Sequence, residues 1–582
     1  MGTRTLLDAP TDARAARSQP GSDSSRSILA ILAVASIAAI LYVCFRDMER
    51  LVSRTFDDAC YYFKIAQNLV QGHGVSFDGV HPTNGFQPLW PILLLPLFAV
   101  LQASPETMFR ACLLFQIGLL ALSAWTLDRA LREFVSGRTR LLAMIAFIVL
   151  VFDPAINGME SAILIFLLVS LFRFGQSKRV FEEPRARSAL GFGLLLGLVV
   201  LARLDTVFIL VALAAATAIE IVRGPERPAR AATRFAWICL GAALLVAPYL
   251  LSNRMTTGHW MPISGLLKSS FPAISRGGSL LERFGVRHLA FLAVGLAALV
   301  TLAPRAFRSR GGGPAYVDAS LCVGALAMIL HALHSYLFMT WAVFRWHFIW
   351  YGLLAIVALA RASETLLALA PAPSRRLVHA AAAALLLATG AYESYRREIQ
   401  DSSYNWHRAA YDAASWARAH TPEHAMFAMH DAGVFAYFSQ RAVINLDGVV
   451  NDLEYQERLR ERHLRTYLAN NHVGYLVSHE AGKTMNVRSY TAAHLRVLSR
   501  LYSVWSDALT LRRSDEVYRG PIYRLDRRYD VACIIWRLEP EDSRAARRSD
   551  PAPRVDRSDT APPSVLAGTP SALAAAPNPA LR

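Results

Sequence analysis

Cysteine motifs are absent from this 582-residue chain, although it contains six cysteines. The cysteines stand singly, at Cys44, Cys60, Cys112, Cys239, Cys322 and Cys533. No CxxC pair occurs, so the sequence gives no zinc ribbon, no redox motif and no disulfide framework. It also lacks an HExxH motif and any cluster of His and Cys ligands. We therefore expect buried or inert thiols and no metal site of these kinds.

Acidic side chains are in short supply. The chain has 44 Asp and Glu against 61 Lys and Arg, which gives a formal net charge of +17. A basic chain is a candidate for binding nucleic acid or anionic lipid. The arginines lie between apolar runs, however, and the sequence has no basic stripe interleaved with aromatic residues. The charge therefore fits the positive-inside rule of membrane proteins, and we expect no nucleic-acid partner.

Apolar residues, by contrast, are abundant and occur in long runs. The chain is 54% hydrophobic, and its mean hydropathy is +0.30, which is high for a soluble protein. The runs cover residues 27–45, 141–152, 189–201, 206–222, 235–251, 288–302, 321–337, 348–360 and 378–391. Each approaches the roughly 20 residues that cross about 30 Å of hydrocarbon. We predict an α-helical polytopic membrane protein with about 11 transmembrane helices.

Loops rich in arginine alternate with loops poor in cations. The positive-inside rule places the basic loops in the cytoplasm; they lie at residues 129–140, 173–187, 223–234, 305–310 and 375–376. All basic loops fall on the cytoplasmic side only if the proline-containing stretch 89–101 does not cross the membrane. We therefore predict an interfacial or re-entrant segment there. The prediction is a multi-pass inner (plasma) membrane protein with a cytoplasmic N-terminus. A large first outer loop, residues 46–110, then lies on the periplasmic or other extracytoplasmic face.

Composition divides the chain into four parts. Residues 1–26 and 541–582 are polar, and we predict two disordered tails, the first of them cytoplasmic. Residues 27–395 form the predicted transmembrane domain. Residues 396–540 alternate β-like and helical stretches, which predicts an α/β domain on the same face as the first outer loop. Its expected strands lie at 425–429, 442–446, 473–477 and 531–536, and its expected helices at 409–419 and 453–468.

Two adjacent carboxylates, Asp57 and Asp58, lie just past the first predicted helix. Neighbouring carboxylates raise each other's pKa, and one of them can then act as a general base. Alternatively, such a pair caps the N-terminus of a helix. The stretch HPTNGFQPLW, residues 81–90, follows in the same loop. Its Trp suits a sugar face and its Asn and Gln suit hydroxyl groups, so the loop is a candidate sugar site.

Together these features resemble the GT-C superfamily of polyprenyl-phosphate-sugar-dependent glycosyltransferases. Further stretches are similar to its bacterial arabinofuranosyltransferase- and mannosyltransferase-like branch: NGMES at 157–161, LARLD at 201–205, TGHWMPISGLLKSSFP at 257–272 and INLDGVVND at 444–452. The resemblance covers most of residues 27–540. It depends on the order of these motifs and on their shared side of the predicted membrane, since no single motif is highly specific.

The resemblance implies an inverting glycosyltransferase. An Asp of the first outer loop deprotonates an acceptor hydroxyl, which attacks the anomeric carbon of the lipid-linked sugar as the lipid phosphate departs. Asp57 matches the base position best and Asp58 second. The implied partners of the leaving phosphate are Lys268, Arg345, His347 and Arg203. The implied sugar- or acceptor-binding residues are Tyr61, Tyr62, His81, Asn84, Gln87, Trp90, Asn157 and Glu160.

Some of these residues have structural interpretations too. Arg345 and His347 equally fit interfacial anchors beside neighbouring tryptophans. Arg203 is also placed to pair with Asp205 at a helix end. Glu160 fits a helix-capping acid, and Asp447 in NLDG fits a turn after a strand.

The resemblance implies no cofactor beyond the polyprenyl-phosphate sugar, which is a substrate. A divalent metal at Asp57 and Asp58 is not expected, although two carboxylates suit magnesium or calcium. The expected partners are the lipid bilayer, the lipid-linked sugar and a glycan, lipid or protein acceptor; mannose, arabinofuranose and aminoarabinose carriers stay open. Two other functions also stay open, a transporter or flippase of a lipid-linked sugar and a non-catalytic membrane scaffold. A transporter is expected to place ionisable residues in mid-membrane, whereas the notable polar residues here lie near the ends of predicted helices.

Overall fold

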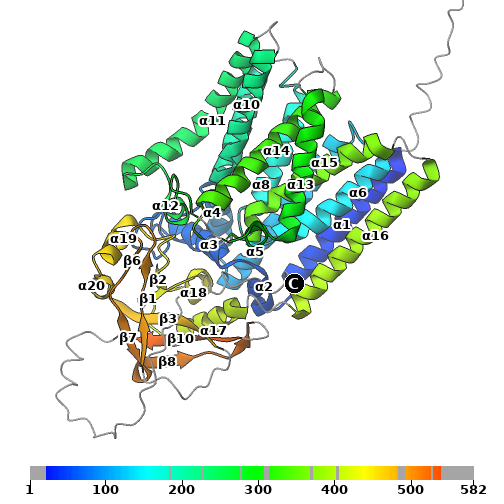
Figure 1. The fold of residues 1–582 in the computed structure, drawn as a ribbon. Coiled ribbons are helices and arrows are strands. Elements are labelled where there is room, and N and C mark those ends of the chain that lie inside the picture. The colour runs from blue at the N-terminus through cyan, green and yellow to red at the C-terminus, as the bar shows by residue number, and fades with distance from the viewer. Residues whose placement is uncertain are drawn as a thin grey trace, which may run out of the picture.

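The computed structural model describes residues 21–182, 185–223, 228–275, 278–306, 313–341, 343–367, 371–400, 405–482, 492–525 and 529–538. The predicted tail 541–582 and residues 1–20 of the other predicted tail lie outside the described residues. Residues 21–26 of that tail are helical and begin the first helix. Figure 1 shows the long helices on one side of the molecule, the strands at the opposite end, and α3, α4 and α12 between them.

The helical part consists of α1 (Gly21–Phe45), α2 (Met48–Arg54), α3 (Asp57–Val70), α4 (Leu89–Leu101), α5 (Pro105–Leu131), α6 (Gly137–Phe147), η3 (Ile148–Phe152), α7 (Asp153–Ala155), α8 (Ser161–Ser177), α9 (Ala186–Ala202), η4 (Leu204–Val207), α10 (Phe208–Arg223), α11 (Pro228–Thr257), α12 (Ile263–Lys268), α13 (Leu280–Ala306), α14 (Gly313–Phe338), η5 (Arg345–Phe348), α15 (Ile349–Leu367), α16 (Ala372–Tyr395) and η6 (Arg396–Gln400).

Among the described residues, eight helices are long and apolar enough to cross a membrane. Two further apolar helices, α8 and α9, have 17 residues each, and α6 continues through a π-helical turn into α7. The multi-pass character is therefore confirmed, whereas the count of about 11 spans stays a prediction. Helix α4 has 13 residues, fewer than the roughly 20 that a straight span needs, in line with the prediction that this stretch does not cross.

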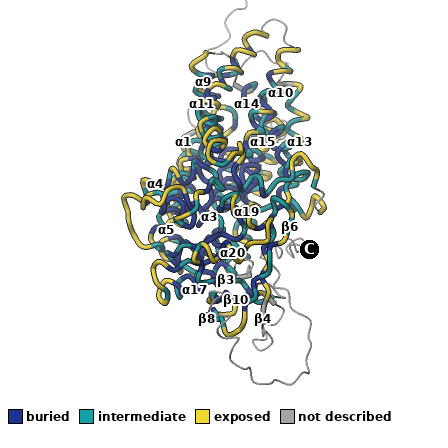
Figure 2. Tube along the Cα trace, turned by 90° about the vertical axis from the view of Figure 1, so that its left-hand side faces the viewer, coloured by how far each residue is buried: buried dark blue, intermediate teal, exposed yellow. Residues whose placement is uncertain are grey.

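Burial is uneven along the long helices. Figure 2 shows mostly exposed and intermediate residues at the far ends of α10 and α11, and buried residues toward the strand-containing end. In the most apolar windows of these two helices only 22% and 17% of the residues are buried inside the protein. Apolar side chains that no other part of the protein covers suit contact with lipid.

The strand-containing domain consists of α17 (Asn405–His420), β1 (Met426–Met429), α18 (Gly433–Ser439), β2 (Ala442–Asn445), α19 (Leu453–Arg460), α20 (Leu464–Asn470), β3 (Val473–Gly482), β4 (Ala492–Leu495), β5 (Leu498–Ser499), β6 (Val504–Trp505), β7 (Leu509–Arg512), η7 (Arg513–Asp515), β8 (Glu516–Arg519), β9 (Tyr523–Arg524) and β10 (Asp530–Arg537).

The main sheet of this domain has the order β2-β1-β3-β10-β8, with β9 also paired to β10. Strands β2, β1 and β3 are parallel, and β10 runs antiparallel to β3. All four strands predicted from the sequence are present. The predicted helix 453–468 is instead two helices, because Arg462 takes a left-handed conformation with φ 60° between them.

Both faces of the sheet are buried, since alternate residues of a strand point to opposite sides. Ala428 packs with Ile444 and with residues of α19 and α20 in a core of its own. Phe427 and Val443 face the other way, and they join α17 and α18 in a core that continues into the helical part. The domain is therefore packed onto the helices and not merely tethered to them.

The first loop meets the domain at close range. Thr83 donates its hydroxyl hydrogen to the carbonyl of Asn451 (3.1 Å), and Gln67 bonds to Gln440 (2.6 Å). Gly85 lies so near Val449 that a Cβ atom at residue 85 would collide with the Val449 carbonyl oxygen. Only glycine fits at this position.

Candidate active site

The two adjacent aspartates begin the same helix and point in different directions. Successive residues of an α-helix turn by about 100°, so the side chains of Asp57 and Asp58 leave the helix in different directions. Asp57 is 4% exposed, and its Oδ2 and Oδ1 accept the backbone N–H groups of Gly433 (2.9 Å) and Val434 (2.7 Å). These amides open α18, so Asp57 joins the first loop to the α/β domain.

Replacing Asp57 by alanine is expected to loosen this junction. Two buried N–H groups would lose their acceptor, at about 1–3 kcal/mol each in the free energy of unfolding. Thermal unfolding in nanodiscs and limited proteolysis of the α/β domain measure the effect. Asp47→Ala is the matched control, because Asp47 is exposed and makes no capping hydrogen bond. Equal stability of the two variants would refute the junction role of Asp57.

Asp58 faces the cation that the sequence analysis had proposed for a phosphate. Its Oδ2 lies 3.8 Å from Lys268 Nζ, at the C-terminal end of α12, and its side chain is 28% exposed. Burial raises the pKa of Asp58, the Lys268 ammonium lowers it, and the charge of Asp447 raises it, with a net upward shift. Burial raises the pKa of Asp57 too, so exposure and partners distinguish the two residues. The partly exposed Asp58 suits a general base better than Asp57, whose oxygens both accept backbone hydrogen bonds.

Trp341 lies between two cations of the same region. Lys268 Nζ is 5.7 Å and Arg500 Cζ 3.9 Å from the centre of its ring. Arg500 follows β5 in the α/β domain, and it is close enough to Asp431 and Asp447 for their charges to act on it. The site is therefore composite, with groups from α3, α12, the loop after α14, and the α/β domain. Nothing in the sequence around Arg500 marked it as a site residue.

A second polar group lies at the carboxyl ends of β1 and β2. Asp447 Oδ1 pairs with His430 Nδ1 (3.0 Å), while its Oδ2 accepts the backbone N–H of Asp431 (2.6 Å) and Asn445 Nδ2 (3.3 Å). Burial alone would raise the pKa of Asp447, but the hydrogen bond and charge of His430 hold it below its usual value. Burial and the charges of Asp447, Asp57 and Asp58 raise the pKa of Asp431. The sequence analysis placed Asp447 in a turn after a strand, where it lies, and missed His430 and Asp431.

Arg203 is held by carboxylates. Its guanidinium contacts Asp205 (2.5 and 3.0 Å) and Glu160 (3.3 Å), and it donates to the carbonyl of Trp346 (3.2 Å). Tyr62 donates to the other Glu160 oxygen (2.9 Å), and His331 contacts Asp205 (3.1 Å). The structure therefore shows the ion pair of Arg203 with Asp205 that the sequence analysis considered. Arg203 lies among acidic side chains and does not contact Lys268.

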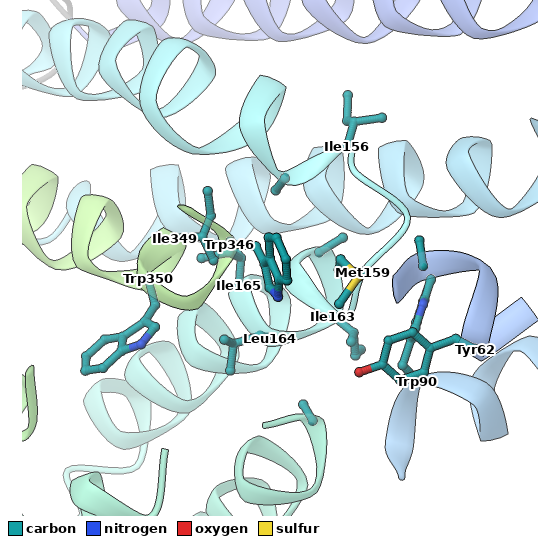
Figure 3. Packing of buried hydrophobic residues seen from close by; sticks show 14 of the residues in the cluster. Tyr62, Trp90, Ile156, Met159, Ile163, Leu164, Ile165, Trp346, Ile349 and Trp350 are labelled. Carbon is teal, nitrogen blue, oxygen red and sulfur yellow. The ribbon is translucent and has the colours of Figure 1, made fainter. Parts of the chain in front are cut away.

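The remaining predicted sugar- and acceptor-binding residues have partners within the protein. The Tyr61 hydroxyl accepts a hydrogen bond from Asn445 (3.2 Å), and His81 contacts Asp78 (2.6 Å). Asn84 contacts Asn253 (3.2 Å) and the N–H of Ile263 (3.0 Å), and Gln87 accepts the N–H of Leu204 (3.0 Å). Asn157 contacts Pro154, Ser161 and Met159, and Trp90 donates to the carbonyl of Gly158 (2.9 Å). Figure 3 shows Trp90 and Tyr62 beside Met159. Because Trp90 has no exposed surface, it offers no face to a sugar in this arrangement.

The other two predicted phosphate ligands differ in exposure. The side chain of Arg345 is exposed, and it makes no hydrogen bond or ion pair with the side chain or backbone of another described residue. His347 is buried, and its Nδ1 accepts the N–H of Phe344 (3.2 Å). The structure does not bring either residue into contact with Asp58 or Lys268. Their binding to a phosphate stays a prediction.

The carboxylates do not form a metal cage. Within the described part of the chain, no three His, Cys, Asp or Glu side chains are grouped so that they could hold a metal ion. Both oxygens of Asp57 accept backbone amides, and the absence of a divalent ion at Asp57 and Asp58 stays a prediction.

An apolar cavity of about 130 Å³ lies inside the helical part. Residues of α5, α8, α9, α10, α14 and α15 line it, and all but Ser320 and Tyr316 among them are apolar or glycine. Trp350, on α15, is one of the lining residues. Such a space suits hydrocarbon.

Comparisons with known proteins add three findings. Residues 397–528 match a family model described as a domain of unknown function (DUF8728). A comparison with curated protein sequences gives no match. The oligosaccharyltransferase of Archaeoglobus fulgidus, tethered to an acceptor peptide, is similar over 78% of this chain and 69% of its own, with 14% identity and a TM-score of 0.45. ArnT from Cupriavidus metallidurans, bound to undecaprenyl phosphate, is similar over 86% of this chain and 97% of its own, with 12% identity and a TM-score of 0.46. At these values the likeness is one of general shape and assigns no activity to this chain.

Proposed function

We propose that this protein is a glycosyltransferase that moves a sugar from a polyprenyl-phosphate carrier to a hydroxyl group of an envelope acceptor. The observation that carries the proposal is the pair of Asp58 and Lys268, 3.8 Å apart where apolar helices meet a polar α/β domain. A partly exposed carboxylate beside a cation supplies a proton acceptor and a partner for a leaving phosphate in one place.

The chemistry follows from these positions. Asp58 takes the proton of the acceptor hydroxyl, and the oxygen attacks the anomeric carbon from the side opposite the phosphate. The bond from this carbon to the phosphate oxygen breaks, so the configuration inverts. Negative charge then grows on the leaving phosphate, where Lys268 and Arg500, both beside Trp341, stabilise it. Asp57, through its hydrogen bonds to α18, holds the α/β domain in position next to Asp58.

The carrier lipid needs an apolar binding surface. The cavity between α8, α10, α14 and α15 has such a lining, and Trp350, three residues after His347, lies at one of its walls. We assign it to part of the prenyl chain. In the proposed reaction Lys268 and Arg500 balance the charge of the phosphate, and we expect no metal ion.

Transfer from a panel of radiolabelled polyprenyl-phosphate sugars tests the proposal. We expect the wild-type protein in nanodiscs to transfer one of them to the host's envelope glycans, and Lys268→Ala to lower kcat/KM by about 100-fold through weaker charge stabilisation. Lys178→Ala is the control, since Lys178 is exposed outside the site. Absence of transfer by the folded wild-type protein would reject the proposed enzyme activity. Full activity of Lys268→Ala would reject the phosphate role of Lys268.

A further inference from the structure

Three buried polar atoms at the carboxyl ends of β1 and β2 have no hydrogen-bond partner among the described residues. They are His430 Nε2, Asp431 Oδ2 and Asn445 Oδ1. Buried polar atoms are nearly always paired, because an unpaired one costs about 1–3 kcal/mol. Asn445 is only 1% exposed, and its Nδ2 contacts Asp447, so its side chain faces this group. A cluster with three unpaired atoms is prepared for a ligand.

The chemistry of the three atoms defines the ligand. His430 Nδ1 is engaged with Asp447, which leaves Nε2 for a ligand, as an acceptor in the neutral ring and as a donor in the protonated one. Asn445 Oδ1 is an amide oxygen and Asp431 Oδ2 a carboxylate oxygen, so both accept hydrogen bonds. A ligand that pairs with all three atoms needs several closely spaced groups that both donate and accept hydrogen bonds. Adjacent hydroxyl groups of a sugar ring meet this requirement.

The topology of the sheet points to the same place. The chain passes from β1 to β2 on one side and returns past β1 to β3 on the other, which gives the order β2-β1-β3. In parallel sheets, ligands bind outside the carboxyl ends of the strands where the connections diverge in this way. His430 and Asp431 directly follow β1, and Asn445 ends β2. Asp431 also has a left-handed backbone, with φ 45°, which is uncommon for a residue other than glycine.

We propose that His430, Asp431 and Asn445 form a subsite that binds hydroxyl groups of the acceptor sugar beside Asp58. Asp447 positions the His430 ring and does not itself contact the ligand. Asn445 Nδ2 donates to the Tyr61 hydroxyl of α3 (3.2 Å), and Gly433, two residues after Asp431, donates to Asp57 (2.9 Å). A sugar held at the β1–β2 edge therefore lies beside the turn of α3 that carries Asp58. The assignment of this sugar as the acceptor rests on the proposed function, whereas the sugar site itself does not.

Binding and transfer are measured separately to test this subsite. Fluorescently labelled oligosaccharides released from the host's envelope are titrated against the full-length protein in nanodiscs. We expect saturable binding that His430→Ala and Asp431→Asn each weaken about tenfold, the loss expected for one hydrogen bond to such a group. In the transfer assay the same variants raise the KM for the acceptor and leave the KM for the donor unchanged. His424→Ala, at an exposed position before β1, is the control.

The outcomes separate the two proposals. Binding without transfer would reject the glycosyltransferase and keep the sugar site. Transfer with unchanged acceptor KM in both variants would keep the enzyme and overturn the subsite. Absence of saturable oligosaccharide binding by the wild-type protein would also overturn it. Asp431→Asn keeps the shape of the side chain, so it serves where His430→Ala fails to fold.

Discussion

Replacement of Asp58 by asparagine is expected to slow sugar transfer by a factor of about 10² to 10⁴, the usual contribution of a general base. The amide has nearly the same shape as the carboxylate but cannot take up the proton of the acceptor hydroxyl. Donor binding and thermal unfolding should stay close to those of the wild-type protein, because Asp58 is partly exposed and has no backbone partner comparable to those of Asp57. Initial rates with saturating donor measure the effect.

The pH profile gives an independent readout of Asp58. A base must be deprotonated to act, so wild-type activity should fall as pH decreases through the pKa of Asp58, which burial raises above its ordinary value. In Asp58→Asn the residual activity should lack this acid limb. Asp47→Asn is the matched control and should keep both rate and profile. Normal turnover in Asp58→Asn would remove Asp58 from the mechanism and return Asp57 to consideration.

Replacement of Arg203 by methionine is expected to lower the free energy of unfolding by about 3–5 kcal/mol. The side chains of Arg203 and Glu160 are 3% and 2% exposed, so the variant leaves Glu160 buried without its cation. Thermal unfolding in nanodiscs measures this loss. Arg132→Met is the control, because Arg132 is about half exposed and its pairing with Asp128 contributes at most about 1 kcal/mol.

The double variant Glu160→Leu with Arg203→Met distinguishes an ion pair from a phosphate site. The double variant removes the deeply buried Glu160 carboxylate, whereas the partly exposed Asp205 keeps His331 as a partner, so much of the lost stability should return. Donor affinity, measured below the unfolding temperature, should stay near that of the wild-type protein. A stable Arg203→Met variant with greatly reduced donor affinity would instead support the phosphate role implied by the family resemblance.

The sequence predicts the elements of this protein better than the directions of its side chains. Long apolar runs indicate helices because the bilayer demands their length, and the strands of the α/β domain follow from short alternating segments. The break at Arg462 escaped prediction, because a left-handed arginine leaves no mark in composition. A shift of one residue along α3 turns a carboxylate toward another partner. The adjacent aspartates in the sequence therefore predicted where the site lies, but not that Asp57 and Asp58 have different partners.

The residues that complete the site come from distant parts of the chain. LARLD and NGMES are similar to stretches of the family, yet in the structure their acids, Asp205 and Glu160, both pair with Arg203. His430 and Asp431 could have been predicted as site residues, since polar residues directly after a buried parallel strand are a recognised signal of a binding site. Arg500 could not have been predicted from the sequence, because its role depends on the folded position of β5 beside Trp341.

The bond between Asp57 and Gly433 joins residues that are 376 positions apart. At about 5–20 residues per second, the ribosome needs roughly 20–75 s to make the chain between them. During that time the first loop stands beside the membrane without its partner, and neither His430 nor Arg500 has been synthesised. A nascent or prematurely ended chain can therefore insert its early helices, yet it lacks the groups of the α/β domain that complete the proposed site.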